Sequence, residues 1–579
     1  MATAEGSIGR QATPTGRRGR RPSLRLGALL PLALTVLVAV LVVYPLAMVV
    51  LGTFWSAAPG QPGRLTLDNW ASVLSDPTTF EILLTSLAIA VPRTLLALAL
   101  ATAFAWCIAR TNMPGKRLLE GLLVFLFFLP ELPWVLAWML LGAPNVGMLN
   151  QWLGALVPGG EGLINVYSYA GLIVLGAARS APVLFLFIHP ALLAMDATLE
   201  EAARMAGASA WRTLWRINFP LLLPALLASG ILSFVVAMES FEIPQLLGTP
   251  ANIFVFTTRI YDLAYGGHVA NFGAAMVLAL ILLALTGSLI VVQWRLLRGR
   301  SYTTVSGRGF RAQPLDLGWG RWIAFAAILA FFVVFGALPF IVLLLNSFME
   351  LSGFITWEMF TTTHWRNALG REDVVKSITD TLMVGVAAAT LGVVVSVFVS
   401  YVVTRTRWAG RRMLDLLAWA PWAIPGLVMS LGFLWAFVWL PIYGTLWVVV
   451  LALVVRGLPV ASRFFTSTMV QLSAELEESA RVHGGSWIRT FLRIWLPLLR
   501  PAVVGAWILL FVIAVRVLDI VVLLAGPGVR MLSVYIFLWT VTGRQEAGSV
   551  LALIQTALVI VGYIVARRLA RRALQQPGQ

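Results

Sequence analysis

The residues best suited to a specific task lie in a polar segment that occurs twice along this chain. One copy runs from Leu199 to Ala225, and adding 277 to each number gives the other copy, Leu476 to Ala502. The two copies are identical at 16 of 27 positions, without a gap. Their residue types cap helices, turn the chain and offer small side chains, which suits non-covalent docking better than catalysis. The duplication therefore predicts two equivalent docking events.

Each copy predicts a short helix that ends at a glycine. Asp196 and Ser473 occupy equivalent positions, and each can cap a helix N-terminus. The helix then reaches Gly207 or Gly484, and glycine readily adopts the left-handed conformation that ends a helix. Small side chains on one face would let the groove of a partner close around this helix. The small residues are Ala202, Ala203, Ser479 and Ala480.

A second short helix is predicted after the glycine in each copy. Ser209 and Ser486 can cap it, and Pro220 and Pro497 fall where the chain enters the next apolar run. Proline is tolerated in the first turn of a helix. The alternative interpretation is a plain amphipathic connector at the membrane surface. Two gapless copies, each at the same place in its half, favour the docking interpretation.

The composition around these segments is that of a membrane protein. The chain has 579 residues, of which 59% are hydrophobic and 12% charged, about half the charged fraction of a soluble domain. Apolar runs of about 20 residues recur, each long enough to cross a bilayer as a helix. The net charge of +17 resides mostly in short clusters between these runs, which is a topology signal. We therefore expect a lipid bilayer around the chain and no nucleic-acid partner.

Twelve transmembrane helices are predicted, so the expected fold class is an all-α polytopic membrane protein. Basic residues occupy alternate loops, and the positive-inside rule then places both termini and both repeated segments in the cytosol. The loop at 348–378 fits this pattern least well, because it also contains basic residues. The predicted spans are 27–55, 82–108, 118–141, 166–188, 220–238, 270–294, 321–347, 379–404, 413–438, 442–465, 497–516 and 548–567.

The duplication extends over two homologous six-helix halves. Residues 109–117 resemble residues 404–412, and Pro130 aligns with Pro425, at an offset of 295. The first half therefore holds 18 extra residues, and the Gly- and Pro-rich stretch 142–165 is the predicted insertion. The halves have parallel topology and would be related by a pseudo-twofold axis along the membrane normal. The predicted division is a basic cytosolic tail at 1–24, a first half at 25–297, a cytosolic linker at 298–320, a second half at 321–570 and a cytosolic tail at 571–579.

The repeated segment resembles the signature loop of binding-protein-dependent ABC importer permeases. That loop reads Glu-Ala-Ala, then a glycine, an isoleucine, an apolar residue and a proline at fixed spacings. The matching positions are Glu201, Ala202, Ala203, Gly207, Ile217, Phe219 and Pro220 in the first copy, and Glu478, Ala480, Gly484, Ile494, Leu496 and Pro497 in the second. Ser479 departs from the alanine of the pattern, and Phe219 from its usual leucine.

The resemblance implies how the two segments act and which partners they need. In this family the segment is a coupling helix that inserts into a cleft of a separate ATPase subunit. Two ATPase copies, one per segment, would move the halves between inward- and outward-open states. The chain itself would carry no cofactor, because Gly115-Lys116-Arg117, its nearest approach to a phosphate-binding loop, lacks the earlier glycine and the Ser or Thr.

The same resemblance implies a bacterial cytoplasmic (inner) membrane protein that receives its substrate from outside. A periplasmic or lipoprotein solute-binding protein would deliver the substrate to the outer loops. Those loops are 56–80, 142–165, 239–269 and 348–378.

Two other classes of protein share some of these features. Ion-coupled secondary transporters also have twelve helices in parallel halves, but they need buried ionisable residues near the midplane. The predicted spans hold few such residues, Glu131 being the main exception, so this class is less favoured. A membrane enzyme would need an acid–base or nucleophile arrangement, and the sequence offers none. We therefore assign no catalytic residue and expect that the chain is not an enzyme.

Charged residues after the fifth span of each half are the candidate substrate path. At the offset of 277, Glu239 corresponds to Arg516, and Glu242 corresponds to Asp519. Near a pseudo-twofold axis, these four side chains would line the outer mouth of the path. The alternatives are plain outer-loop charges or a structural ion pair between Glu239 and Arg516.

The substrate is less well indicated than the class. Fused permeases with two such loops are similar to the ferric-iron and thiamine importers, and loops 246–261 and 523–536 resemble the ferric-iron members most. Ferric iron is the preferred substrate, with thiamine, polyamine, phosphonate or another small solute as alternatives. Cys107 is the single cysteine and the four histidines are scattered, so no metal site is predicted in the chain itself.

Overall fold

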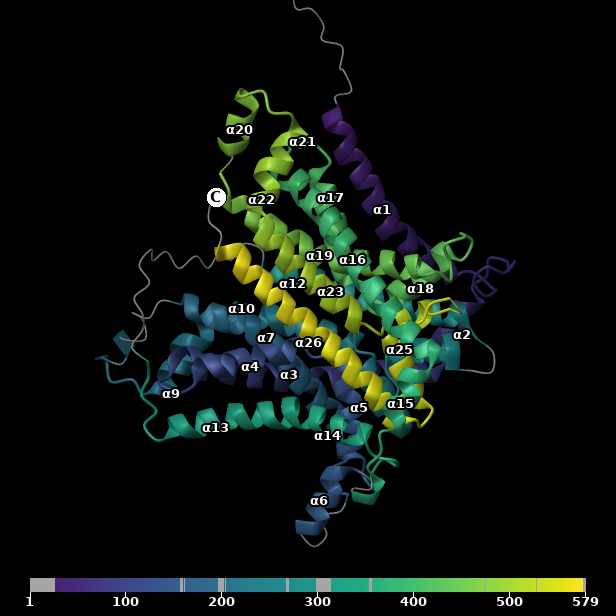
Figure 1. Ribbon diagram of the computed structural model, residues 1–579, viewed down its shortest axis with the longest axis vertical. Coiled ribbons are helices and arrows are strands. Elements are labelled where there is room, and N and C mark those ends of the chain that lie inside the picture. Colours follow the sequence, from purple (N-terminus) through teal and green to yellow (C-terminus); the bar gives the residue numbers. More distant parts are fainter. Residues whose placement is uncertain are drawn as a thin grey trace, which may run out of the picture.

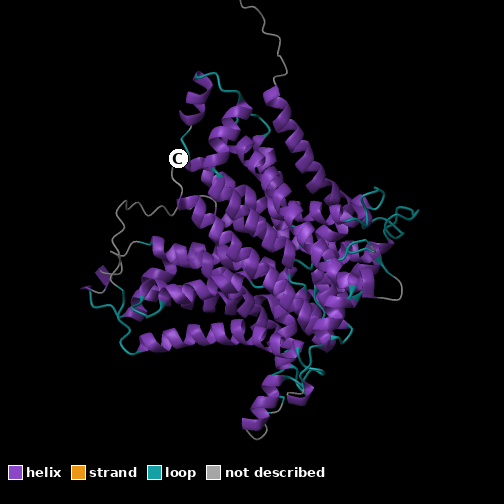
Figure 2. Ribbon diagram, viewed as in Figure 1, coloured by secondary structure: helices purple, strands orange, loops and turns teal. Residues whose placement is uncertain are grey.

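The protein is helical almost throughout (Figure 2). Regular strands are absent from the described residues, and three isolated bridges are the β pairings found there. The predicted tail at 1–24 and residues 298–313 of the linker lie outside the described residues. The computed structural model describes residues 26–156, 160, 162–195, 202–203, 205–266, 270–297, 314–353, 357–473, 475–526 and 528–575.

The first half forms long apolar helices separated by short ones. Its elements are α1 (Leu26–Gly52), α2 (Asp68–Ser75), α3 (Pro77–Arg110), α4 (Lys116–Phe128), α5 (Glu131–Gly142), α6 (Met148–Leu156), α7 (Tyr169–Ala194), α9 (Ala210–Thr213), η1 (Leu214–Asn218), α10 (Phe219–Glu239), η2 (Pro244–Gly248), η3 (Thr249–Ala251), α11 (Phe256–Tyr261), η4 (Asp262–Gly266) and α12 (Phe272–Leu297).

The second half repeats this order without a counterpart of α6. Its elements are α13 (Gly320–Phe332), η5 (Val333–Ala337), α14 (Leu338–Ser347), η6 (Trp357–Met359), α15 (Thr363–Gly370), α16 (Glu372–Arg405), α17 (Arg411–Trp419), η7 (Ala420–Ala423), α18 (Gly426–Phe437), α19 (Leu446–Gln471), α20 (Glu475–Val482), α21 (Trp487–Thr490), η8 (Phe491–Trp495), α22 (Leu496–Leu498), α23 (Arg500–Arg516), α24 (Val521–Leu524), α25 (Leu532–Val541) and α26 (Gln545–Gln575).

The predicted all-α polytopic fold class is confirmed. Within the described ranges, nine helices are long and apolar enough to cross a membrane, and twelve spans result if each bent helix pair counts as one. Three of the predicted spans are not continuous helices. The spans predicted at 118–141, 413–438 and 497–516 correspond to pairs that bend by 99°, 113° and 73°.

Proline causes the two sharpest breaks. Pro130 follows α4 and Pro425 precedes α18, and each lacks a backbone N–H and pushes the residue before it out of helical conformation. Leu129 is accordingly extended at φ −62° and ψ 139°, and Ile424 at φ −99° and ψ 115°. These breaks place irregular backbone inside the bundle, where its carbonyl groups need donors from elsewhere in the protein.

The helices form two arms that meet in a shared core (Figure 1). One arm packs α3, α4, α7 and α10 around buried side chains such as Phe185 and Leu123. The other packs α16, α19 and α23 around Phe465 and Trp495. The largest cluster of buried side chains joins helices of both halves, among them α5, α12, α18 and α25. In Figure 1, α9 lies at the left edge, on one arm, and α20 and α21 lie at the top, on the other.

The first helix of each half packs against the other half. α1 contacts α17 and α18, and Gly432 lets α1 approach closely, since a Cβ there would lie 2.8 Å from the Pro45 carbonyl oxygen. Conversely, α13 packs on the first-half arm, where the rings of Phe104 and Phe331 are 4.9 Å apart. Each half therefore packs against the first helix of the other half, α1 or α13.

Candidate functional site

The second repeated segment folds as the sequence predicts. The hydroxyl of Ser473 accepts a hydrogen bond from the Glu475 N–H at 3.2 Å, at the start of α20. After α20, Gly484 adopts φ +74°, and the Gly485 N–H donates to the Ala480 carbonyl at 2.8 Å. This is the hydrogen-bond pattern of a helix that ends in a left-handed turn. The Ser486 hydroxyl then caps α21 by accepting from the Arg489 N–H at 3.4 Å.

The first segment has the same geometry where it is described. Gly207 adopts φ +80°, the Ala208 N–H donates to the Ala203 carbonyl at 2.9 Å, and the Ser209 hydroxyl accepts from the Arg212 N–H at 3.4 Å. Glu201, like the capping residue predicted at Asp196, lies outside the described residues. The two segments are thus structural as well as sequence repeats. Pro220 falls in the first turn of the membrane helix α10, as predicted. Pro497 instead lies in α22, before the bend of 73° that precedes the membrane helix α23.

The side chains that the sequence singles out for coupling are accessible at the tips of the two arms. Glu478, Ser479 and Ala202 are exposed, and around both glycines the space that a side chain would occupy is open. The remaining predicted positions are exposed or partly buried: Ala203, Ala480, Ile217, Ile494, Pro220 and Pro497. The small side chains therefore form an accessible face with partly buried apolar residues behind it. A groove in a partner could receive this face without steric conflict with the rest of the chain.

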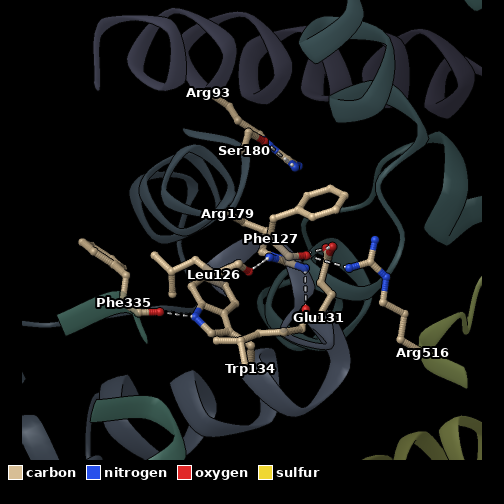
Figure 3. Close-up of polar contacts among 10 residues, drawn as sticks. Arg93, Leu126, Phe127, Glu131, Trp134, Arg179, Ser180, Phe335 and Arg516 are labelled. Atoms are coloured by element: carbon tan, nitrogen blue, oxygen red, sulfur yellow. Dashed lines mark hydrogen bonds and ion pairs between the residues drawn. The ribbon is translucent and has the colours of Figure 1, made fainter. Parts of the chain in front are cut away.

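A second site lies inside the bundle, where the broken helices leave carbonyl groups without donors. The helical donors for the Leu126 and Leu129 carbonyls would be residues 130 and 133, and both are prolines. Arg179 of α7 replaces these donors. Its Nη1 donates to the Leu126 carbonyl at 2.9 Å and its Nη2 to the Leu129 carbonyl at 2.8 Å (Figure 3). One guanidinium therefore fixes the break between α4 and α5.

The same contact recurs in the second half. Arg456 lies 277 residues after Arg179, and Ile424 lies 295 residues after Leu129. The Arg456 Nη1 donates to the Ile424 carbonyl at 3.1 Å, beside the break between η7 and α18. Both halves thus hold a broken helix with an arginine from the neighbouring long helix.

Each of these arginines also meets a carboxylate, but the two carboxylates are not equivalent. The Arg179 Nε lies 3.6 Å from the Glu131 Oε2, within the first half. The Arg456 Nη2 lies 3.9 Å from the Glu239 Oε2, so this ion pair joins the halves. The Glu239 side chain is 9% exposed, and its Oε1 has no hydrogen-bond partner among the described residues. Glu239 therefore pairs with Arg456 and not with Arg516, the partner considered from the sequence.

Asp519 explains why the second half has a glycine, Gly426, at the position equivalent to Glu131. A Cβ at Gly426 would lie 1.8 Å from the Asp519 Oδ2 and 2.4 Å from its Cγ, so the carboxyl group of Asp519 fills the space of a side chain there. Each break therefore has a carboxylate beside it, supplied by Glu131 in one half and by Asp519 in the other.

Arg516 and Glu242 complete this cluster. The Arg516 Nη1 donates to the Phe127 carbonyl at 2.8 Å, which ties the second half to the α4–α5 break (Figure 3). The carboxyl group of Glu242 lies in the neighbourhood of the Glu131 and Asp519 carboxyl groups. We refer to the whole set as the charge cluster. Its members are Arg93, Glu131, Arg179, Glu239, Glu242, Arg456, Arg516 and Asp519.

The four residues predicted to line the path, Glu239, Glu242, Arg516 and Asp519, are thus brought together. They lie partly buried inside the bundle beside the helix breaks, and not in an outer loop. In the described part of the chain, no three His, Cys, Asp or Glu side chains are placed to hold a metal ion together.

The prediction that the spans are nearly free of ionisable residues is wrong. Arg93, Arg179 and Arg456 lie within α3, α7 and α19, and Arg93 is only 3% exposed. Arg179 and Arg456 are tolerated there because the broken helices supply carbonyl acceptors and neighbouring carboxylates supply charge. A signal was available, since Arg179 and Arg456 are identical at the repeat offset of 277.

The comparison with known families agrees with the repeat and with the fold. The model of the family "Binding-protein-dependent transport system inner membrane component" matches residues 96–298 and again residues 390–575. The chain belongs to this family. The double match confirms the predicted fused two-half organisation, and the family together with the apolar helices makes this a multi-pass inner-membrane protein. Each match begins after the helix that is exchanged between the halves.

Curated relatives include two ferric permeases. The ferric transport system permease protein of Actinobacillus pleuropneumoniae is 27% identical over 68% of this chain and 58% of its own length. A putative ferric transport system permease protein of Haemophilus influenzae is 28% identical over 64% of this chain and 58% of its own length. The chain therefore spans little more than half of these relatives. The molybdenum transport system permease protein of Escherichia coli is 29% identical, with 38% of this chain covering 95% of that protein.

Proposed function

We propose that this chain is the permease subunit of an ABC importer and forms the path of ferric iron across the inner membrane. Two ATPase subunits would dock on the repeated segments, one on each. A periplasmic or lipoprotein solute-binding protein would dock on the outer loops. Both termini and both segments would then face the cytosol. The alternative is the same machinery with thiamine, polyamine, phosphonate or another small solute as substrate.

The observation that carries the proposal is the pair of matched exposed turns, one at the tip of each arm. Both copies keep the left-handed glycine, the helix-ending hydrogen bond and the capping serine. A surface connector has no need of identical geometry in two places, whereas two copies of one ATPase require it. The residues proposed to enter the ATPase groove are Glu201, Ala202, Ala203, Gly207, Glu478, Ser479, Ala480 and Gly484, backed by Ile217, Pro220, Ile494 and Pro497.

The charge cluster is the proposed substrate path. It joins both halves through the Glu239–Arg456 pair and the Arg516–Phe127 hydrogen bond, so a movement of one half against the other must rearrange it. Its carboxylates offer oxygen atoms, which suit hard cations, and its arginines balance their charge when no cargo is present. A passing ion would meet these carboxylates transiently and would not be held at a closed metal site.

Uptake of radiolabelled ferric ion in cells with and without the chain tests the proposal. Gly207→Arg combined with Gly484→Arg should block both docking turns and abolish chain-dependent uptake, because each arginine side chain would project where the ATPase must sit. A matched control is Gly543→Arg, which also alters an open glycine of positive φ, at +78°, but away from both repeated segments. The control should retain uptake.

The outcomes separate the class from the substrate. Chain-dependent iron uptake that the double variant loses would support both. If iron uptake does not depend on the chain while the ATPase still co-purifies with it, the substrate is one of the alternatives. If the ATPase fails to co-purify with the unaltered chain, the importer proposal itself is wrong.

A further inference from the structure

The C-terminal end of α16 contacts the chain where it enters the second repeated segment. Arg405, the last residue of α16, donates from Nη2 to the Met469 carbonyl and, at 2.6 Å, to the Leu472 carbonyl. These carbonyls lie at the C-terminal end of α19, where the regular i→i−4 donors run out, and the Leu472 N–H also donates to the Met469 carbonyl at 3.2 Å. A cation is also favoured there by the helix dipole. Arg405 therefore closes the end of the helix that leads into the segment.

The same guanidinium also touches the exit of the segment. The Arg405 Cζ lies 4.6 Å from the ring centroid of Trp495, the last residue of η8, which is 1% exposed. An arginine over an indole face is attracted to it by the ring quadrupole. One side chain thus joins the entry and the exit of the second segment to α16.

Tyr401, one turn earlier in α16, adds a contact with the middle of the segment. Its hydroxyl oxygen lies 3.0 Å from the Glu477 Oε1, and Glu477 belongs to α20, the helix that carries the small-residue face. The Tyr401 ring meets Phe491 and Trp495 edge-on, with centroids 6.0 Å and 6.3 Å apart. The last two turns of α16 therefore contact the entry, the short helix and the exit of the segment.

The first half repeats the arginine contact, with different residue types around it. Arg110, the last residue of α3, donates from Nη2 to the Leu192 carbonyl at 2.8 Å and to the Met195 carbonyl at 3.2 Å. Arg110 and Arg405 are 295 residues apart, whereas their acceptor carbonyls are 277 residues apart. The same contact is therefore present in both halves, although the first half holds 18 extra residues between the donor and its acceptors. In contrast, Trp106 and Asn218 stand where the second half has Tyr401 and Trp495.

The helices that carry these arginines extend back to the interior of the bundle. α3 also contains Arg93, a member of the charge cluster, whose Nη2 donates to the Ser180 hydroxyl of α7 at 3.4 Å (Figure 3). Arg110 lies 17 positions after Arg93 in α3, a distance of about 25 Å along the helix axis. In α16, the Ser400 hydroxyl donates to the Ser462 carbonyl of α19 at 2.8 Å. A displacement of either segment would be passed to a stiff rod that reaches the interior.

We propose that Arg405 and Arg110 are positioning residues that transmit the movement of the repeated segments to α16 and α3. This inference rests on the proposed docking of ATPases to those segments. In the second half Arg405 acts together with Tyr401 and Trp495, and in the first half Arg110 makes the equivalent carbonyl contacts. Without Arg405, the ATPase should still dock and hydrolyse ATP, but less substrate should be transported for each ATP hydrolysed.

The test is the amount of ferric ion taken up for each ATP hydrolysed, measured in proteoliposomes with the full chain, its ATPase and its binding protein. Arg405→Met should lower this ratio by about fivefold or more, the smallest effect typical of coupled sites. Arg405→Lys should recover part of the ratio, because an ammonium group still donates to the carbonyls. Arg407→Met, which removes an equal charge from an exposed neighbour, should leave the ratio unchanged.

A second variant separates transmission from folding. Tyr401→Phe removes only the hydroxyl that meets Glu477, and it should lower the ratio less than Arg405→Met does. An unchanged ratio in both variants, even with less folded protein, would mean that the contacts only stabilise the fold and would overturn the inference. If the unaltered chain neither binds the ATPase nor takes up iron, the proposed function fails instead, and the two failures are distinguishable.

Discussion

At the residue scale, Arg179 and Arg456 donate hydrogen bonds to carbonyl groups beside the helix breaks, where an unbroken helix would use backbone N–H groups. Prolines at 130 and 133 remove the donors of the Leu126 and Leu129 carbonyls, and Arg179 supplies both replacements. An unpaired buried carbonyl costs about 1–3 kcal/mol, so the break and its arginine must be kept together. Arg456 has a double task, because it also pairs with Glu239 of the other half.

Replacement of Arg456 should therefore be costly. Arg456→Leu leaves the Ile424 carbonyl and the Glu239 carboxylate without this partner, and we expect a loss of about 1–3 kcal/mol of stability. Thermal unfolding of the purified protein in detergent measures the loss. Arg463→Leu on the same helix is the control, since its pair with Asp415 is exposed and such pairs contribute at most about 1 kcal/mol. Equal destabilisation by the two variants would contradict the role assigned to Arg456.

At the element scale, the end of the linker is tied to the loop between α3 and α4. The Leu315 N–H donates to the Arg110 carbonyl at 2.8 Å, and the Asn112 N–H donates to the Leu315 carbonyl at 2.9 Å. Asp316 strengthens this tie by accepting from the Gly318 N–H and from the Asn112 side chain. α13 follows directly and packs on α4, so the tie sets where the exchanged helix begins.

This tie should depend on pH. The Gly318 N–H and the Asn112 amide hold the pKa of Asp316 below its ordinary value of 3.8. A depressed pKa in the folded protein means that the contribution is complete above the ordinary pKa and is lost as the pH falls through the folded pKa. Asp316→Asn should therefore lower the unfolding temperature slightly at neutral pH and make no difference below the folded pKa.

The comparison is made by thermal unfolding at neutral and at strongly acidic pH. Glu350→Gln removes another exposed carboxylate and is the control for a general effect of charge. A difference between the Asp316 variant and the unaltered chain that persists or grows in acid would contradict the assigned sign.

At the scale of the whole molecule, the two arms place equivalent segments apart from each other while their opposite ends share one core (Figure 1). The exchange of α1 and α13 binds each arm to the other half. In the proposed transport cycle, the arm tips would move relative to each other while the shared core holds the halves together. Side chains at the tips and at α6 are exposed enough to report which side of the membrane they face.

Cysteine labelling of whole cells tests this topology. In a Cys107→Ser background, Met205→Cys and Val482→Cys should react only after the cytosol is opened, and Leu156→Cys should react from outside with an impermeant reagent. The native side chains at these positions are 89%, 84% and 78% exposed, so accessibility within the protein does not limit the reaction. Labelling of Met205→Cys and Val482→Cys from opposite sides would refute parallel halves.

The sequence by itself determined the class, the repeat and the local shape of the repeated segments. These follow from short-range chemistry: apolar runs that must satisfy their backbone as helices, capping serines, and glycines at 207 and 484 that alone accept a left-handed turn without strain. Each such preference acts within a few residues, so it can be read along the chain. The gapless offset of 277 between the copies also allowed the two-half organisation to be predicted from the sequence.

Only the tertiary structure decided which charges meet. Glu239 pairs with Arg456 instead of Arg516, Asp519 fills the space above Gly426, and Arg405 reaches Trp495, because packing brings together positions far apart in sequence. The breaks at Leu129 and Ile424 were within reach of the sequence, since prolines mark them, but their arginine donors were not. A carbonyl freed by proline can be satisfied by any donor that the fold brings near, and local sequence does not say which one arrives.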